Sequence, residues 1–250
     1  RGCVLRFSPD GKTREKIVSG VRYLMSMQFN REGDLFATDQ EGATWLPNGN
    51  PFDELLHIQQ GRHYGFPPRH PKYLSGVIDE PSVFDYGPQH QSLCGFRFNH
   101  GRGAAAFGPA TWEEDALIAG FTRGKLYRTK LVKTAAGYVA SNQLVAALQS
   151  LAADVSFGPD GGLVVASHTG KPDWGTGPQG AGILHKIRYK DRKAAQPVAA
   201  WSAGRGEFRV AFDQPLDPQQ LKSLARNVAI EAGRSVAAGD RFETIRPGYE

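Results

Sequence analysis

Residues 155–166, VSFGPDGGLVVA, read as a strand, a tight turn and a second strand, and this order decides the fold class. Apolar β-formers flank the segment GPDG at 158–161, in which Pro presets φ and Gly accepts a positive φ. Residues 27–39, MQFNREGDLFATD, repeat the order, and SPDG at 8–11 is a turn of the same kind. The chain is therefore expected to fold from short strands joined by tight turns.

A second motif, G-x-L-x-R, recurs beside this hairpin. It is present at 124–128 as GKLYR, residues 2–6 resemble it, and residues 182–187, GILHKI, begin it once more. Recurrence of a four-strand unit at roughly 40 to 50 residues is typical of β-propeller blades. A β-sandwich also has short strands, but it lacks this recurring pair of motifs. We expect residues 182–187 to open a further unit that remains incomplete.

The units divide the chain into three parts. Residues 1–190 hold about three to four units, whereas propellers close with about four to eight blades, so we expect part of a larger propeller. Residues 191–199 turn polar and Ala-rich, as a linker does. Residues 200–250 contain an alternating strand at 207–213 that the prolines after it end, and we expect the start of an immunoglobulin-like β domain.

The composition excludes several function classes. The 250 residues include 30 Gly and 16 Pro, which suits an all-β protein, and no apolar run is long enough to span a membrane. The net charge of +5 comes from Lys and Arg interleaved with 25 acidic residues, which indicates a solvated surface and no nucleic-acid partner. Cys3 and Cys94 lie outside any CxxC pattern, so neither zinc nor covalent haem is encoded. We expect either a disulfide, in an exported protein, or two buried thiols.

Residues 53–67, DELLHIQQGRHYGFP, place two adjacent carboxylates ahead of a Gly-framed aromatic turn. Asp53 and Glu54 offer hard oxygen donors, and carbonyls of a surrounding loop would complete a calcium shell of about six to eight oxygens. The alternative is a solvated acidic pair on a surface turn. His63 and His70 are expected either as exposed loop residues or as the polar rim of a pocket.

The order of these motifs resembles that of the soluble quinoprotein glucose and aldose sugar dehydrogenases, within the wider glucose/sorbosone dehydrogenase family. Residues 38–42, TDQEG, then 53–55, DEL, then 61–67, GRHYGFP, are similar to the family series T-E-x-G-P, D-E-[IL]-N and G-x-N-Y-G-W-P. Later matches lie at 94–98, 123–128 and 154–161. The resemblance covers most of residues 2–190. It implies that these residues are the C-terminal part of a six-bladed β-propeller.

The resemblance also implies two calcium sites. A structural calcium would be held by Asp53, the side chain of Glu54 and the backbone carbonyl of Tyr64. Backbone atoms of Gly42 and Ala43 would reach a second calcium, which the family shares with its cofactor, pyrroloquinoline quinone.

The quinone site is where the sequence departs from the family. The quinone carries carboxylates and requires guanidinium or ammonium groups. Arg22 matches one of the family's cations, but the other three fall on Thr122, Leu151 and Ala153. The family's catalytic base, a His of an earlier blade, has no counterpart here. The sequence therefore predicts a degraded quinone site with Arg22, Gly42 and Ala43 as its remaining cofactor-binding positions.

Residues 167–178, SHTGKPDWGTGP, and 212–217, FDQPLD, resemble multidomain exported bacterial proteins. In these proteins such a propeller is followed by an immunoglobulin-like segment and often by a cytochrome c domain. The resemblance implies a periplasmic or secreted location and a haem partner. His168, Asp173 and Trp174 are candidates for sugar binding, because an aromatic face stacks on a pyranose and a carboxylate accepts from its hydroxyls. The alternative is a surface loop with the Trp packed under it.

Three functions remain open from the sequence. The first is a quinone-dependent oxidoreductase that oxidises a sugar or another small alcohol and passes electrons to a haem partner. The second is a non-catalytic propeller that binds carbohydrate or a partner protein. The third is a lactonase-type hydrolase with a metal held by acids at the channel centre. Arg22 begins a predicted strand, where it either faces an anionic ligand or pairs between blades.

Overall fold

The computed structural model of the chain describes residues 2–41, 52–66, 78–87, 91–100, 106–170, 180–191, 194–224 and 226. These residues form an all-β fold, and their only helical elements are the 3-10 turn at Ala110–Trp112 and α1 (Pro218–Leu224). No helix in this described part has the length and apolar composition needed to cross a bilayer. The all-β prediction is therefore confirmed.

The described residues of the propeller form four sheets, which we name blades 1 to 4 in the order of their first strands along the chain. Blade 1 contains β1 (Cys3–Phe7), β2 (Arg14–Ser19), β6 (Arg62–His63) and β7 (Ile78–Asp79). Blade 2 contains β3 (Leu24–Phe29), β4 (Leu35–Asp39), β5 (Asp53–His57) and β8 (Phe84–Tyr86). Blade 3 contains β9 (Leu93–Phe98), β10 (Ala116–Gly120), β11 (Lys125–Thr134) and β12 (Gly137–Ala147). Blade 4 contains β13 (Leu151–Phe157), β14 (Leu163–His168) and β15 (Gly182–Ile187).

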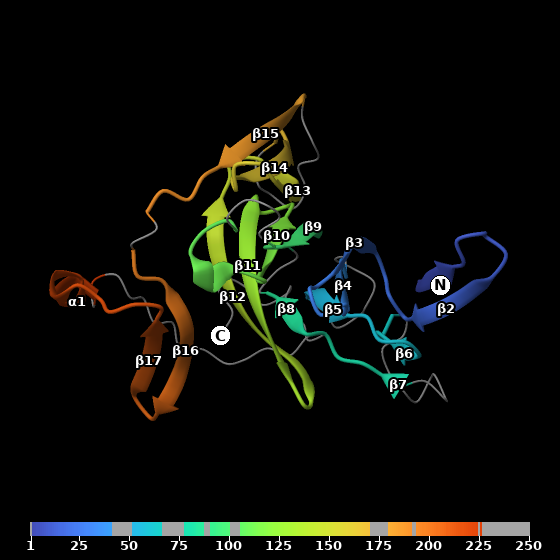
Figure 1. Cartoon of the computed structure of the whole chain (residues 1–250), viewed down its shortest axis with the longest axis horizontal. Helices are drawn as coiled ribbons and strands as arrows, with labels where there is room; N and C mark the ends of the chain where they lie inside the picture. Colours follow the sequence, from blue (N-terminus) through green and yellow to red (C-terminus); the bar gives the residue numbers. More distant parts are fainter. Residues whose placement is uncertain are drawn as a thin grey trace, which may run out of the picture.

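The blades lie side by side in chain order, from the blue strands of blade 1 to the orange strand β15 (Figure 1). Strand β9, the first strand of blade 3, contacts both β3 and β13, the first strands of its two neighbours. Buried apolar clusters fill the spaces between successive blades, and burial of apolar surface is the main stabilising term in folding. The largest side chains of these clusters include Tyr64 between blades 1 and 2, Phe36 and Phe96 between blades 2 and 3, and Leu117 and Leu126 between blades 3 and 4.

The tight turns form as the sequence predicts. In the first, the N–H of Gly11 donates to the carbonyl of Ser8 at 2.9 Å, and in the second the N–H of Gly161 donates to the carbonyl of Gly158 at 3.1 Å. Gly11 and Gly161 have φ values of 71° and 73°, in the left-handed region that favours glycine. The turn at 158–161 joins β13 to β14, the first two strands of blade 4.

The repeated four-strand unit is present, but it starts at a different strand from the predicted one. The G-x-L-x-R motif lies on β11, the third strand of blade 3, and its partial copy at Gly182–Ile187 is β15, the third strand of blade 4. The prediction that residues 182–187 open a new unit is therefore wrong, because β15 pairs with β14 along its whole length. Each repeat in the sequence is predicted to begin with the G-x-L-x-R motif, but this motif lies on the third strand of blades 3 and 4. The repeat in the sequence therefore starts in the middle of a blade.

Strands β16 (Pro197–Gly204) and β17 (Glu207–Phe212) form a separate two-stranded sheet. β17 confirms the predicted strand at 207–213, and β16 begins inside the predicted linker. Blade 3 holds this sheet by the carbonyl of Pro197, which accepts from Gln143 Nε2 at 3.1 Å and from Arg128 Nη2 at 3.4 Å. Arg128 is itself buried, 3.6 Å from a carboxylate oxygen of Asp115. The predicted immunoglobulin-like domain extends beyond the described residues.

The two cysteines are unpaired and differ in environment. Cys3 is exposed on β1 and Cys94 is buried on β9. Burial raises the pKa of the Cys94 thiol to about 12. The structure therefore has no disulfide between them, and the expectation of two buried thiols holds only for Cys94.

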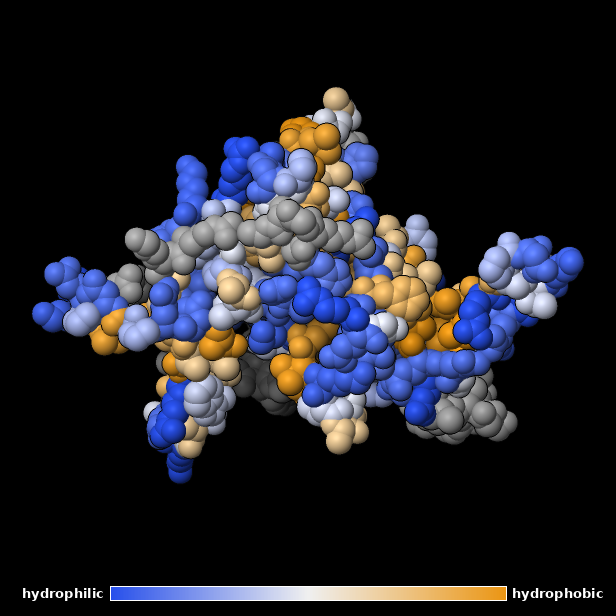
Figure 2. Space-filling view, viewed as in Figure 1, coloured by the Kyte–Doolittle hydropathy of each residue, from blue (hydrophilic) through white to orange (hydrophobic). Residues whose placement is uncertain are grey.

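Apolar side chains remain exposed on β1 of blade 1, β3 of blade 2 and β15 of blade 4. Figure 2 shows orange residues over β1 and β3 and again over β15. The side chains involved are Phe7, Met27, Phe29, Ile183 and Leu184.

Gly95 tests the packing between blades 3 and 4. A Cβ at this position would lie 1.7 Å from Oδ1 of Asp154, so alanine forces strands β9 and β13 apart. We expect Gly95→Ala to lower the free energy of unfolding by about 1 to 3 kcal/mol, the usual cost of overpacking. The measurement is urea denaturation of the full chain. The control is Gly204→Ala, since a Cβ there meets no atom within 4 Å, and an equal loss in both variants would contradict this account.

Candidate functional site

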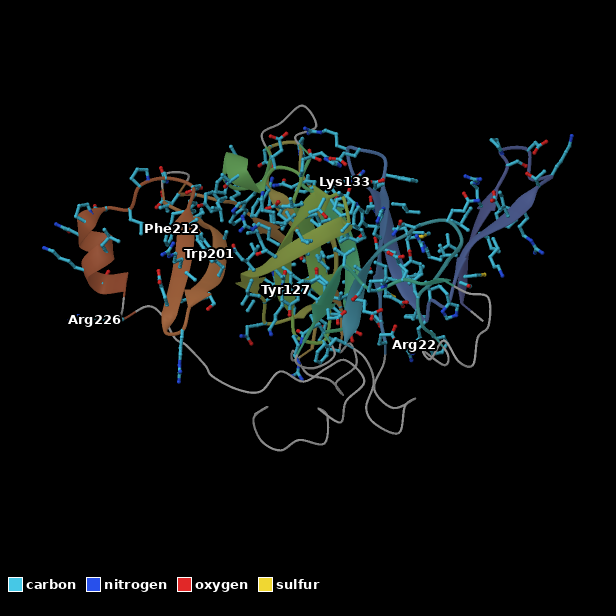
Figure 3. The ribbon with its side chains drawn as sticks, turned by 90° about the horizontal axis from the view of Figure 1, so that it is seen from below. Arg22, Tyr127, Lys133, Trp201, Phe212 and Arg226 are labelled. Carbon is cyan, nitrogen blue, oxygen red and sulfur yellow. The ribbon has the colours of Figure 1, made fainter. Side chains whose placement is uncertain are left out.

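The candidate site lies where the first strands of blades 2, 3 and 4 begin. Because neighbouring strands of a blade are antiparallel, β4 ends and β5 starts at this same edge. We name it the Arg22 end; its described residues are Arg22, Asp39, Gln40, Glu41, Asp53, Gln91, Ser92, Thr122, Leu151 and His168. Figure 3 shows Arg22 and Lys133 on opposite sides of the molecule. Lys133 marks the other end, where it contacts Asp34 at 2.7 Å.

Asp53 joins blade 2 to blade 3 at the Arg22 end. Its Oδ1 accepts the N–H of Glu41 at 2.9 Å, and its Oδ2 accepts the N–H groups of Gln91 at 2.8 Å and Ser92 at 2.6 Å. The carboxylate is 1% exposed, so these charge-assisted bonds form in a region that excludes water. Asp53 thus fixes the backbone that leads into β9.

Ser92 has an unusual backbone conformation. Its φ is 49°, in the left-handed region that a residue with a Cβ rarely adopts. The hydrogen bond to Asp53 and the pairing that begins at Leu93 hold it there. Strained residues of this kind cluster at functional sites, which agrees with the position of Ser92.

Asp39 anchors the segment that precedes β3. Its two carboxylate oxygens accept the N–H of Arg22 at 2.9 Å and the N–H of Tyr23 at 2.6 Å. Burial is the largest influence on this group and raises its pKa to about 6, against the lowering effect of these two hydrogen bonds.

Arg22 pairs within blade 2 and does not stand free in the channel. Its Nη1 donates to the carbonyl of Gln40 at 2.8 Å, and the side chain is half-buried. Gln40 in turn donates from Nε2 to the carbonyl of Leu93 at 2.9 Å, which lies on blade 3. The bond of Arg22 thus lies within blade 2, and Gln40, rather than Arg22, makes the contact between blades 2 and 3.

The predicted calcium ligands lie on a strand and not on a loop. Asp53 and Glu54 are consecutive residues of β5, so their side chains point to opposite faces of blade 2. Glu54 shares its face with Leu56, and Leu56 packs in the same cluster as Tyr64. The structure thus brings Glu54 and Tyr64 to one side of the blade and places the Asp53 side chain on the other.

The described residues contain no group of three or more His, Cys, Asp or Glu side chains that would hold a metal. The predicted calcium set needs fewer acids, because it combines carboxylates with a backbone carbonyl. The Tyr64 hydroxyl is not part of it, since it donates to the carbonyl of His57 and accepts the N–H of Gln59 at 2.9 Å. Burial raises the pKa of this hydroxyl to about 12. Glu54, which is 1% exposed, is a buried carboxylate on this face.

The structure places the remaining predicted site residues in different environments. His63 was expected in an exposed loop or at a pocket rim, but it lies on β6, 7% exposed, and its Nδ1 accepts the N–H of Gly65 at 3.0 Å. His168 ends β14 and is exposed, with its ring 5.9 Å from that of Phe121. Gly42, Ala43, His70, Asp173 and Trp174 lie outside the described residues.

The positions that replace the quinone-binding cations are apolar or buried. Leu151 is fully buried and Thr122 is 8% exposed. Ala153 lines a cleft of about 270 Å³ with His168, Ile183 and Leu184. A cation is therefore absent from each of these three places in the described part of the chain.

No pattern in the sequence marks Gln91 or Ser92 as site residues. Gln91 accepts the Tyr127 hydroxyl on its Oε1 at 2.6 Å, and burial raises the Tyr127 pKa. Tyr127 belongs to the G-x-L-x-R motif, which was read only as a mark of the fold. The role of these residues depends on the approach of β5, β9 and β11, which no local pattern encodes.

Comparison with known proteins shows similarity at the level of structure. No family model and no curated protein matches the sequence. A crystal structure of glucose dehydrogenase matches with a TM-score of 0.50 and 19% identity, over 73% of this chain and 49% of that chain. An oxidoreductase structure from Thermus thermophilus, described as a glucose dehydrogenase, matches with a TM-score of 0.49 and 19% identity, over 69% and 47%. The soluble aldose sugar dehydrogenase of Escherichia coli, in its apo form, gives 0.46 and 17%, over 69% and 46%.

The chain thus spans about half the length of the solved structures it matches. At these identities the similarity establishes the fold, a propeller of the glucose dehydrogenase type. This confirms the fold that the sequence resemblance implied.

The Asp53 junction makes a testable contribution to stability. We expect Asp53→Ala to lower the free energy of unfolding by about 3 to 5 kcal/mol, because three buried N–H groups lose their acceptor. Urea denaturation measures this loss. The matched control is Glu207→Gln, an exposed carboxylate paired only locally with Arg209, for which we expect a change within about 0.5 kcal/mol. A similarly small change in the free energy of unfolding for Asp53→Ala would refute the role of Asp53 in joining blades 2 and 3.

Asp39 predicts a pH dependence with a defined sign. Its folded pKa of about 6 lies above the usual 3.8, so the folded state favours the protonated acid. The resulting stability is full below about pH 4 and is lost as the pH rises through 6. Relative to Asp39→Asn, the wild-type free energy of unfolding should fall by about 2 to 3 kcal/mol between pH 4 and 7. A constant difference between the two proteins across this range would rule out the raised pKa.

Proposed function

We propose that the Arg22 end is the carbohydrate-binding end of a sugar-dehydrogenase-type propeller whose quinone site is degraded. The observation that carries the proposal is the Asp53 junction, which builds a rigid, buried polar frame from blades 2 and 3 at one end of the inner strands. Ligand sites need such pre-organised polar groups on a rigid scaffold. The ligand proposed is a sugar or another small alcohol.

Calcium fits one side of this frame. Glu54 is buried on β5, and Tyr64 belongs to the apolar cluster on the same face of the blade. We assign Glu54 as the side-chain ligand, with the Tyr64 carbonyl beside it, and Asp53 as the residue that holds the surrounding backbone. A calcium ion here would link β5 to the segment after β6 and so stabilise blades 1 and 2 together.

Pyrroloquinoline quinone does not fit the described residues. Its carboxylates require several cations, whereas Arg22 is the cation at one of the four matching positions and Leu151 is a fully buried apolar residue. Thr122 offers a hydroxyl in place of an ammonium group. Leaving the carboxylates of a ligand without charged partners costs several kcal/mol of binding free energy.

The first of two candidate roles for the full-length protein comes from the family resemblance. By the sequence resemblance, this role is a sugar or alcohol oxidoreductase of the periplasm or the exterior that passes electrons to a haem partner such as a cytochrome c domain. It requires cations from residues outside the described part of the chain.

The second candidate is a non-catalytic propeller that recognises carbohydrate or a partner protein. Two observations favour this candidate: Leu151 is fully buried, and the Arg22 guanidinium donates to the carbonyl of Gln40 within blade 2. Neither arrangement needs a bound quinone, and the polar frame around Asp53 stays intact without one.

Calcium binding is tested by thermal unfolding of the full chain in calcium and in EDTA. We expect calcium at about 100 times its dissociation constant to raise the melting temperature by roughly 5 to 10 °C. Glu54→Gln should abolish this rise, whereas Glu207→Gln should keep it. Equal melting temperatures with and without calcium in the wild-type protein would refute the metal site.

A titration with the quinone separates the two candidate functions. We expect no saturable change in quinone absorbance with the calcium-loaded protein, together with binding to members of a carbohydrate array. Saturable quinone binding would contradict the degraded site and favour the oxidoreductase. Absence of binding to every member of the carbohydrate array would contradict carbohydrate recognition, whether or not calcium raises the melting temperature.

A further inference from the structure

A second cleft lies at the end of the inner strands opposite Arg22. It has a volume of about 520 Å³ and is formed where β3 and β9 end and where the turn joins β13 to β14. We name it the Phe29 cleft; its lining residues include Gln28, Phe29, Arg97, Phe98, Ser156 and Phe157. The volume falls within the range of about 300 to 1,000 Å³ that is usual for small-molecule sites.

Arg97 brings a positive charge to this cleft. Its Nη1 donates to the carbonyl of Phe96 at 2.8 Å, and its Nη2 lies 3.6 Å from Oδ2 of Asp154. The side chains of Arg97 and Asp154 are 34% and 48% exposed, so their ion pair is weak. A guanidinium carries five N–H groups, and donors therefore remain for a ligand.

The chain holds Arg97 in place from the neighbouring blade. Oδ1 of Asp154 accepts the N–H of Val155 at 2.8 Å, which orients the carboxylate toward β9. Gly95 makes room for it, since a Cβ there would lie 1.7 Å from the same oxygen. Asp154 thus acts as a positioning residue for the guanidinium.

Aromatic rings form the apolar part of the cleft. Phe29 is 64% exposed at the end of β3, which is a high exposure for a phenyl ring. Phe157 is half-buried, and Phe98 is buried with its ring stacked 5.9 Å from that of His100. A flat apolar ligand would cover Phe29 and remove its surface from water.

The neighbouring charges at this end pair with one another. His100 Nδ1 lies 3.0 Å from Glu114, and Arg31 contacts Glu114 at 2.6 Å and Glu113 at 3.0 Å. These pairs leave Arg97, among the described residues that line the cleft, as the cation with spare donors. A single guanidinium beside phenyl rings suits one carboxylate on a ring better than it suits a phosphate, which needs more positive charge.

We propose that the Phe29 cleft binds a small aromatic carboxylate. Its carboxylate receives N–H donors from Arg97, and its ring packs between Phe29 and Phe157. Gln28 and Ser156 supply an amide and a hydroxyl for polar substituents on the ring. This site is independent of the carbohydrate end, because the two lie at opposite ends of the inner strands.

Isothermal titration of the full chain with benzoate tests the proposal. We expect saturable binding, about tenfold weaker binding of benzyl alcohol, which lacks the charge, and weaker binding of cyclohexanecarboxylate, which lacks the flat ring. Equal heats for benzoate and acetate would overturn the assignment, since they would indicate a site for any carboxylate. Absence of saturation with benzoate would overturn it as well.

Variants locate the site. Arg97→Gln should weaken benzoate binding roughly 10- to 100-fold, because a charged hydrogen bond is lost, and Phe29→Ser should weaken it several-fold. Lys12→Gln, a change of an exposed cation on the β1–β2 turn, and His168→Gln, at the Arg22 end, should leave it unchanged. Melting temperatures verify that each variant is folded. Unchanged binding in a folded Arg97→Gln protein would refute the Phe29 cleft as the binding site.

Discussion

The structure of the Arg22 end depends on one buried carboxylate. Asp53 accepts three backbone N–H groups from two blades, and it does so while only 1% exposed. A carboxylate in that position must be fully hydrogen-bonded, because an unsatisfied buried charge would cost more than the fold can tolerate. The same bonds fix the left-handed backbone of Ser92 and thereby the start of β9. Together with the bonds from Thr38 and Gln40 to the carbonyls of Cys94 and Leu93, Asp53 joins blade 3 to blade 2.

This use of Asp53 changes the chemistry assigned to the end of the propeller. A carboxylate that holds three N–H groups anchors backbone, and Glu54, the next residue, lies on the opposite face of β5. Arg22 contributes one guanidinium at this end, and its Nη1 donates to the carbonyl of Gln40. The frame is thus rigid and polar but poor in available positive charge. It suits a neutral, hydroxyl-rich ligand better than a tricarboxylate.

The two ends of the inner strands differ in chemistry although the same three strands build them. At the Arg22 end, buried acids meet backbone N–H groups. At the other end, Arg97 and exposed phenyl rings line an open cleft, and Asp154 connects β13 to β9. The alternation of side chains along a strand separates these environments within a few residues. One propeller therefore has two ends of unlike chemical character.

The tight turns and short strands of this protein could be predicted from the amino-acid sequence alone. Its Pro-Asp-Gly turns, short β-rich runs and recurring motifs predicted an all-β propeller, because turn type and strand period depend on neighbouring residues alone. The family resemblance predicted a calcium ligand at Glu54 and a loss of cations at Thr122, Leu151 and Ala153. The folded structure was needed to find the strand at which each repeated unit starts. It was also needed to place Asp53 and Glu54 on a strand, to show that His63 is buried and to find the partner of Arg22. Each of these depends on which blade lies next to the residue, and contacts between blades join positions far apart in the chain that no local pattern records.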